Sequence, residues 1–390
     1  ASTSAPALRF PGFTEPWQKC RLGDYIRIFS GESPNRINSE YDKIPYYKVE
    51  QLNWCEKYLG ETPYLSQRGK NILPEGCVVF SKRGAAILTN KVRMNLFPIN
   101  IDTNLMGIKA DNSFILDQYL FYFILRARLN RIADTSTIPQ INNIHINPIT
   151  IYVPSLAEQE IITKFLALLD ERIATQRRLI EDFISLRRAI LQDAIKRGLS
   201  KKSWKFTTLN DILTERGERN SDGYDVCSVS VSEGVVNQIE YLGRSFAAKE
   251  TRQYNVARYG DIIYTKSPTG SFPYGIVKRD TQKEPAAISP LYGVFVPKQD
   301  WIGMLLGYYF ESEVNTFNYL HPIIQKGAKN TINITNSGFL ANSVPLPSNE
   351  SEASALAKCL DTITNKIVLE KSVLTHYTEQ REYLLSKMFV

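Results

Sequence analysis

The chain of 390 residues is internally duplicated, and this limits the folds open to it more than any other feature. Four short segments of the first half recur in the second half, in the same order and 184 to 193 residues later. Loop insertions and deletions would produce such small drifts in separation. The chain is therefore expected to contain two similar halves. The matching pairs are 17–24 with 204–211, 71–80 with 255–264, 140–143 with 333–336, and 153–155 with 346–348.

Each half begins with a mixed region of roughly 140 residues in which short apolar runs lie between turn-forming residues. These runs predict strands at 77–80, 149–153, 261–265 and 292–296. Amphipathic spacing predicts helices at 114–128 and 303–317. The mixed regions are thus predicted to be globular domains of the mixed α/β class.

Each half closes with a long segment that lacks proline, Leu156–Arg197 in the first half and Ser351–Met388 in the second. Apolar residues recur there at three-and-four spacing, and the two stripes are related by a single separation of 194. Their interruptions also correspond, Gln176 with Glu370 and Arg187 with Arg381. The predicted interface residues are Ile162, Leu166, Leu169, Ile173, Ile180 and Phe183, and Leu356, Leu360, Ile363, Ile367, Leu374 and Tyr377.

A helix of about 40 residues is ~60 Å long, too long for the core of one compact domain. A stripe of this kind needs a partner of similar length, so the two helices are expected to form a coiled coil with each other. Two unrelated core helices are the alternative. The short basic link 196–205 favours an antiparallel return. Two globular domains separated by two long antiparallel helices, related by a pseudo-twofold axis, are the expected architecture.

The predicted boundaries follow from these patterns. They are an N-terminal segment 1–16, a first globular domain 17–155, a first long helix 156–198, a linker 199–203, a second globular domain 204–348 and a second long helix 349–390.

The composition argues against catalysis by this chain. Only three histidines occur, and they are far apart, while the five cysteines form no C-x-x-C pair, so no metal site is expected. A phosphate-binding loop, a dinucleotide fingerprint, a nucleophile elbow and the Pro-Pro-aromatic motif of amino-methyltransferases are all missing. The net charge of +7 permits an acidic partner such as nucleic acid. Residues 1–6 lack the design of a secretion signal and no long apolar stretch is present, so a cytoplasmic location is expected.

The ordered pattern resembles the specificity (S) subunit of type I restriction-modification enzymes over nearly the whole chain. The residues at the two domain starts, 17–24 and 204–211, carry part of the resemblance. The segments 76–84 (GCVVFSKRG) and 260–268 (GDIIYTKSP) resemble a loop of that family, and 151–162 (IYVPSLAEQEII) resembles its entry into the first long helix. The second copy departs at this entry, because 346–352 (LPSNESE) lacks the Glu-Gln pair.

The resemblance implies a DNA-binding, non-catalytic subunit in which each globular domain is a target recognition domain for one half of a bipartite, asymmetric sequence. The helices would fix the spacing of the half-sites and dock two methyltransferase (M) subunits. Restriction (R) subunits would complete the complex. No cofactor is expected in this chain, because the M subunits bind S-adenosylmethionine and the R subunits use ATP and magnesium.

The candidate DNA-contacting residues are polar side chains in two clusters of each half. One cluster follows the repeated strand and the other precedes the last strand of the half. Arg and Lys suit guanine or phosphate, and Asn and Gln suit adenine. The candidates are Ser81, Lys82, Arg83, Thr137, Gln140 and Asn142 in the first half, and Thr265, Lys266, Ser267, Thr269, Lys326, Lys329 and Asn330 in the second.

Each of these residues could instead be a solvated loop charge or a turn former. Two other functions also stay open at this stage. A two-headed coiled-coil DNA-binding regulator or scaffold would bind a defined operator tightly without any M subunit. An enzyme of unrecognised type would act on DNA as a single chain.

Overall fold

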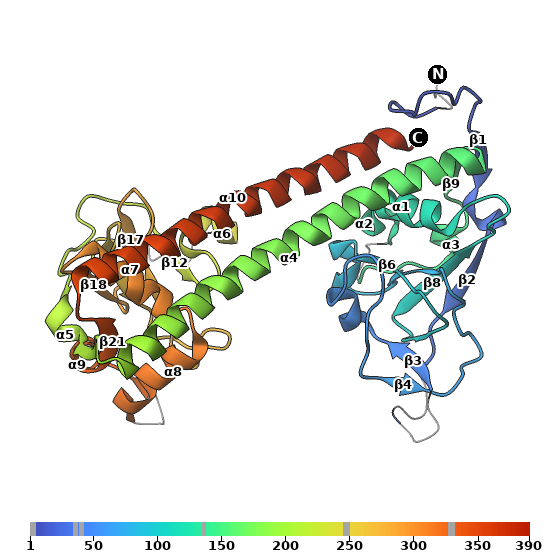
Figure 1. The fold of residues 1–390 in the computed structure, drawn as a ribbon. Helices are drawn as coiled ribbons and strands as arrows, with labels where there is room; N and C mark the ends of the chain where they lie inside the picture. Colours follow the sequence, from blue (N-terminus) through green and yellow to red (C-terminus); the bar gives the residue numbers. More distant parts are fainter. Residues whose placement is uncertain (1–4, 34–37, 39–42, 135–137, 245–249, 327–331) are drawn as a thin grey trace. The chain divides into compact units, whose positions relative to one another are not determined.

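The computed structural model describes residues 5–33, 38, 43–134, 138–244, 250–326 and 332–390 (Figure 1). The chain divides into two units, residues 1–179 with 371–390, and residues 180–370. Two long helices, α4 (Leu156–Ser200) and α10 (Glu350–Met388), each contribute one part to each unit. The mixed α/β class is as predicted.

The first unit is built around a four-stranded antiparallel sheet with the order β2-β8-β5-β6. A smaller sheet, β4-β3-β7, and the pair β1-β9 accompany it. Its elements are β1 (Gln18–Arg21), η1 (Leu22–Asp24), β2 (Ile26–Ser30), β3 (Ile44–Tyr47), η2 (Val49–Asn53), β4 (Leu65–Ser66), β5 (Val78–Ser81), η3 (Ala85–Thr89), β6 (Val92–Met94), β7 (Asn100–Ile101), β8 (Leu105–Ala110), α1 (Asp117–Ala127), α2 (Leu129–Ile132), α3 (Asn143–Ile146) and β9 (Thr150–Val153).

The second unit contains a four-stranded antiparallel sheet with the order β11-β18-β15-β16, and strand pairs β10-β21, β12-β13, β14-β17 and β19-β20. Its elements are β10 (Trp204–Thr208), α5 (Leu209–Ile212), β11 (Leu213–Glu215), β12 (Cys227–Ser230), β13 (Gly234–Asn237), α6 (Gln238–Leu242), β14 (Asn255–Ala257), β15 (Ile262–Tyr264), β16 (Val277–Arg279), β17 (Ala286–Ile288), β18 (Gly293–Pro297), α7 (Asp300–Tyr309), α8 (Glu313–Leu320), η4 (His321–Ile323), β19 (Gln325–Lys326), β20 (Ile332–Asn333), α9 (Asn336–Ala341) and β21 (Ser343–Pro347).

The two units repeat one topology, which confirms the predicted duplication. In both, the first strand pairs with the last one before the long helix, β1 with β9 and β10 with β21. In both, the repeated apolar strand, β5 or β15, lies inside the central sheet. The four strands predicted from the sequence are β5, β9, β15 and β18, correct to within one residue at each end.

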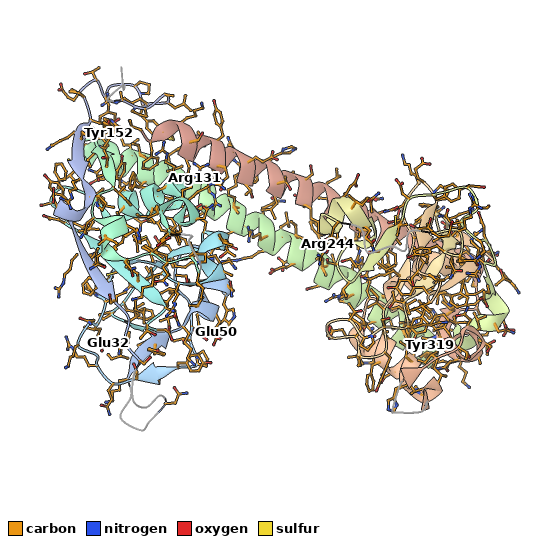
Figure 2. The ribbon with its side chains drawn as sticks, turned by 180° about the vertical axis from the view of Figure 1, so that it is seen from behind. Glu32, Glu50, Arg131, Tyr152, Arg244 and Tyr319 are labelled. Carbon is orange, nitrogen blue, oxygen red and sulfur yellow. The ribbon has the colours of Figure 1, made fainter. Side chains whose placement is uncertain are left out.

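Both faces of each central sheet are covered, which explains the uninterrupted apolar runs of β5 and β15. Along β5, Val78 and Phe80 join the core that also holds the helices, whereas Val79 joins a second core on the opposite face. β15 alternates in the same way, because Tyr264 joins one core and Ile263 the other. Tyr319 of α8 is buried in the core that contains Tyr264 (Figure 2). Its hydroxyl donates to the carbonyl oxygens of Phe339 and Asn342.

The long helices run antiparallel. In the first unit the start of α4 packs with the end of α10, since Ile162 and Leu166 share a core with Leu385 and Met388. In the second unit the end of α4 packs with the start of α10, since Leu191 shares a core with Ala353, Ala357 and Leu360. Such pairing confirms the predicted direction of the second helix.

The predicted interface residues all lie on the covered sides of these helices. Seven are buried, namely Ile162, Leu166, Leu169, Ile173, Ile180, Leu360 and Ile367. Five are half-buried, namely Phe183, Leu356, Ile363, Leu374 and Tyr377.

The N-terminal segment packs against the helices of the first unit. The guanidinium of Arg9 forms an ion pair with the buried carboxylate of Glu158, with N···O distances of 2.7 and 2.8 Å. The ring of Phe10 meets that of Phe165 edge to face at 5.6 Å between centroids. The backbone N–H of Leu8 donates to the carbonyl oxygen of Lys387. Residues 8–10 therefore contact both α4 and α10 in the first unit.

One predicted element is wrong. The segment 303–317 was predicted as a single helix, but two helices occur, α7 ending at Tyr309 and α8 beginning at Glu313. Ser312 caps α8 by accepting from the backbone N–H of Asn315, which starts a new helix in the middle of a continuous apolar pattern. Within the described residues, no helix combines the length and apolar character needed to cross a membrane.

Candidate nucleic-acid interface

The loop after β5 exposes positive charge. Ser81 ends the strand buried, and its hydroxyl donates to the carbonyl oxygen of Arg83 at 3.0 Å. This bond turns the chain, so that Lys82 is half-buried and Arg83 is exposed. Gly84 follows with a φ of +81°, in the left-handed region that glycine adopts without strain. A Cβ at this position would meet no atom within 4 Å, so an approaching ligand finds open space there.

The structure brings the two predicted clusters of the first unit together. The N–H of Ile141 donates to the carbonyl oxygen of Lys82, and the N–H of Gly84 donates to that of Pro139, each at 2.9 Å. Arg83 pairs with Gln140 as a single antiparallel bridge. The loop 81–84 and the segment 138–142 therefore form one continuous surface.

Gln140 and Asn142 differ in how free their side chains are. Gln140 is half-buried. Asn142 is exposed but caps α3, because its side chain accepts from the backbone N–H of His145 while the His145 ring accepts from the N–H of Asn142. Thr137 lies outside the described residues. The predicted DNA contacts of all these residues stay predictions.

The corresponding loop of the second unit has a different shape. Thr265 is buried, and its hydroxyl accepts from the N–H of Ile276 at 3.1 Å. Lys266 is half-buried with a φ of +57°, and burial lowers its pKa against the opposing effect of Glu215. Ser267 is exposed, and Thr269 exchanges two backbone hydrogen bonds with Phe272 around Gly270. The loop is thus a short hairpin with a lysine at its base.

An aromatic cluster begins two residues after this hairpin, at Tyr274. Tyr274 lies 5.3 Å from the ring of Phe317 and 5.9 Å from that of His321, and the last two rings stack at 5.1 Å. His321 belongs to η4, which leads directly into β19, where Lys326 pairs with Ile332. Of the second predicted cluster, Lys326 therefore lies on a segment that neighbours the hairpin. Lys329 and Asn330 lie outside the described residues.

None of Tyr274, Phe317 and His321 is among the residues predicted from the sequence to contact DNA. Phe317 keeps 40% of its surface exposed, and His321 is exposed. A nucleic-acid base can stack on such rings. The spacing of Phe317 and His321 by four residues was the available signal, because such residues share one side of a helix.

The surface offers charged and hydrogen-bonding groups. Among the residues that the structure describes, no group of three or more His, Cys, Asp or Glu side chains could hold a metal ion. All five cysteines are free thiols. Arg131 on α2 adds another exposed cation in the first unit (Figure 2).

Comparison with known proteins gives consistent matches. A family model described as the type I restriction modification DNA specificity domain matches residues 14–182. The specificity subunit of the type I restriction enzyme MjaVIII from Methanocaldococcus jannaschii is 24% identical over 403 aligned positions, covering 93% of this chain and 89% of that protein.

Two solved structures share the fold. The S subunit of a type I restriction-modification system from M. genitalium matches with a TM-score of 0.57 at 14% identity, covering 99% of each chain. A chain from a structure on complex assembly and conformational transition of the type I R-M system matches with a TM-score of 0.55 at 15% identity, covering 98% of this chain and 99% of that one.

Proposed function

Because the chain belongs to the family of type I restriction-modification specificity subunits, we propose that it recognises a bipartite, asymmetric DNA sequence and that each unit contacts one half. The subunit provides DNA sequence specificity and is not itself catalytic. Its partners are DNA and the other subunits of the restriction-modification system.

The assignment of one half-site to each unit is supported by one observation: equivalent strands of the two sheets are followed by different polar loops. β5 and β15 occupy the same place in their sheets, yet Lys82-Arg83 follows one and Lys266-Ser267 follows the other. The donors and acceptors presented by a loop determine which base edges it accepts in the major groove. Two different loops on one scaffold suit two different half-sites. Exposed cations beside them would neutralise phosphate.

The long helices suit the spacing of the half-sites. α4 runs for 45 residues and α10 for 39 without interruption, and each takes part in both units. A continuous helix pair is stiffer than a flexible linker, whose end-to-end distance varies widely. We therefore propose that the helices fix the length of the gap between the half-sites.

An exposed apolar stripe on α4 suits the docking of methyltransferase subunits. Ile161, Phe165 and Leu168 remain 40%, 38% and 65% exposed. Their spacing of four and three residues places them on one side of the helix. Exposed apolar groups in such a row mark protein interaction sites. Two M subunits would bind here and on α10, supplying S-adenosylmethionine, and R subunits would supply ATP- and magnesium-dependent cleavage in the cytoplasm.

The test is methylation sequencing of a host that expresses this chain together with its M subunits. Modified adenines are expected in one bipartite motif with a fixed gap, and cells with the M subunits alone should lack them. Methylation without a motif would refute the proposal. Tight binding of the isolated chain to one operator would instead support the regulator alternative.

A further inference from the structure

An equivalent, partly buried contact between the long helices occurs in both units. In the first unit Nη1 of Arg381 donates to Oδ1 of Asp170 at 3.1 Å. In the second unit Nη1 of Arg187 donates to Oγ1 of Thr364 at 2.6 Å. The two arginines are 194 residues apart and so are their acceptors, the separation that relates the helical stripes. The two contacts are therefore equivalent under the internal duplication.

Each acceptor also binds a tyrosine from a helix of the globular part. The hydroxyl of Tyr122 on α1 donates to Oδ2 of Asp170 at 2.6 Å. The hydroxyls of Tyr308 on α7 and Thr364 are 2.9 Å apart. Thr364 already donates its only hydroxyl hydrogen to the carbonyl oxygen of Leu360, so Tyr308 is the donor. In each unit one side chain thus joins three helices.

Both junctions are charged and partly buried, since the side chain of Arg381 is 21% exposed and that of Asp170 is 14% exposed. The side chain of Arg187 is 10% exposed, and its Nη2 lies 2.5 Å from Glu311, while the guanidinium lies 5.0 Å from the ring centroid of Tyr308. In the first unit Nζ of Lys57 donates to the hydroxyl of Tyr122 at 2.9 Å. Burial lowers the pKa of Lys57 to about 8, although the nearby Asp170 opposes this shift. Charge-assisted hydrogen bonds in such surroundings are strong and directional.

We infer that Arg187 and Arg381 are positioning residues, which hold α7 and α1 in one register against the long helices and so narrow the range of gap lengths accepted between half-sites. Apolar side chains along a helix pair tolerate small shifts, because dispersion contacts are non-directional. The planar fork of arginine tolerates them poorly. The inference rests on the proposed recognition of a bipartite target.

The experiment uses the full chain with its M subunits and a plasmid library in which one half-site pair is separated by the native gap or by one base pair more or less. The variants are Arg187→Met and Arg381→Met, which retain the apolar stem and lose the fork. Arg178→Met is the matched control, because Arg178 is exposed on α4. The measured quantity is the ratio of methylation at native gaps to methylation at altered gaps.

In Arg187→Met and in Arg381→Met this ratio is expected to fall about tenfold, the scale of one lost charge-assisted hydrogen bond. The bases preferred within each half-site should stay the same, and Arg178→Met should match wild type. Arg187→Lys and Arg381→Lys, which restore a charged N–H donor without the planar fork, should recover part of the ratio. An unchanged ratio overturns the inference, even where total methylation or thermal stability falls.

Two further variants keep the test decisive if the methionine variants fail to fold. Tyr122→Phe and Tyr308→Phe remove only the hydroxyl of each junction and should lower the ratio in the same direction. If wild type itself shows no bipartite motif, the proposed function fails. If wild type shows a strict gap that every variant keeps, only the inference fails.

Discussion

The side-chain amide of Gln159 binds the backbone at the entry to α1, because its Oε1 accepts from the N–H of Leu116 at 2.8 Å. Its Nε2 donates to the carbonyl oxygens of Phe114 and Pro154 at 2.9 and 3.0 Å. Gln159 is fully buried, so these three bonds satisfy its polar groups. The corresponding residue of the second helix, 194 positions later, is Ala353, which is also buried but carries no polar group to bind the backbone.

Replacing Gln159 should destabilise the first unit. In Gln159→Ala the N–H of Leu116 and two carbonyl oxygens lose their partner inside the protein, at a cost of about 2–3 kcal/mol. Thermal melting followed by circular dichroism should show this loss. Gln192→Ala, an exposed glutamine on the same helix, is the control and should melt like wild type. Equal melting of the two variants would contradict the assigned role.

The stability of the second unit should depend on Asp280. This carboxyl is fully buried, and its Oδ2 has no partner among the described residues. Burial raises its pKa from 3.8 to about 6. The folded state thus holds this proton more tightly than the unfolded state, and raising the pH from about 4 through 6 removes stability.

Asp280→Asn removes that titration. The melting temperature of the variant relative to wild type should therefore be higher at pH 7.5 than at pH 4.5 (on the order of several degrees at most, given the size of the unit). A difference that is constant across this range would show that the carboxyl does not titrate there.

Arg83 should contribute to DNA affinity through the first unit. Arg83→Ala is expected to weaken binding of the complex to its target. If the contact is to phosphate, the slope of log K against log salt should fall by about 1, and base preference should not change. Fluorescence anisotropy over a salt series measures both quantities. Arg68→Ala, an exposed cation after β4, is the control.

Exchange of residues 17–155 for the recognition domain of another specificity subunit should change one half of the methylated motif. The other half and the chemistry of methylation should stay as in wild type. Methylation sequencing of the hybrid provides the measurement. A simultaneous change in both halves would mean that the units do not recognise DNA independently.

Insertion of four residues after Gln176 and after Glu370 should lengthen the recognised gap. Four helical residues add about 6 Å and return the side chains to nearly the same direction. Both positions are buried and correspond under the separation of 194. Insertion into α4 alone should abolish pairing of the helices. A double insertion with full activity and unchanged spacing would refute the role of the helices.

The sequence predicted those features that depend on local periodicity. Four strands and both long helices follow from apolar spacing. The duplicated stripe predicted that the two helices pair, and the short link 196–205 predicted that they run antiparallel. The break between α7 and α8 was not predicted, because the apolar pattern continues across it. Only Ser312 gives a local signal. Capping is a weaker signal than hydrophobic spacing.

The arrangement of the candidate site was predictable only in part. The loop after β5 could be located from the repeat, but its junction with Pro139 and Ile141 depends on backbone hydrogen bonds between distant segments. The ion pair of Arg9 with Glu158 is equally non-local, since 149 positions separate the two residues. No local pattern encodes such pairings.

The bond from Tyr122 to Asp170 also bears on how such proteins diversify. Tyr122 lies within the part that an exchange of 17–155 would replace, and Asp170 lies outside it. A foreign unit that brings no hydroxyl to this place would leave the carboxylate with one hydrogen bond fewer beside the partly buried Arg381. Horizontal transfer of half-genes should therefore succeed most often between lineages that retain this donor, so that the helices filter which new specificities a population can acquire.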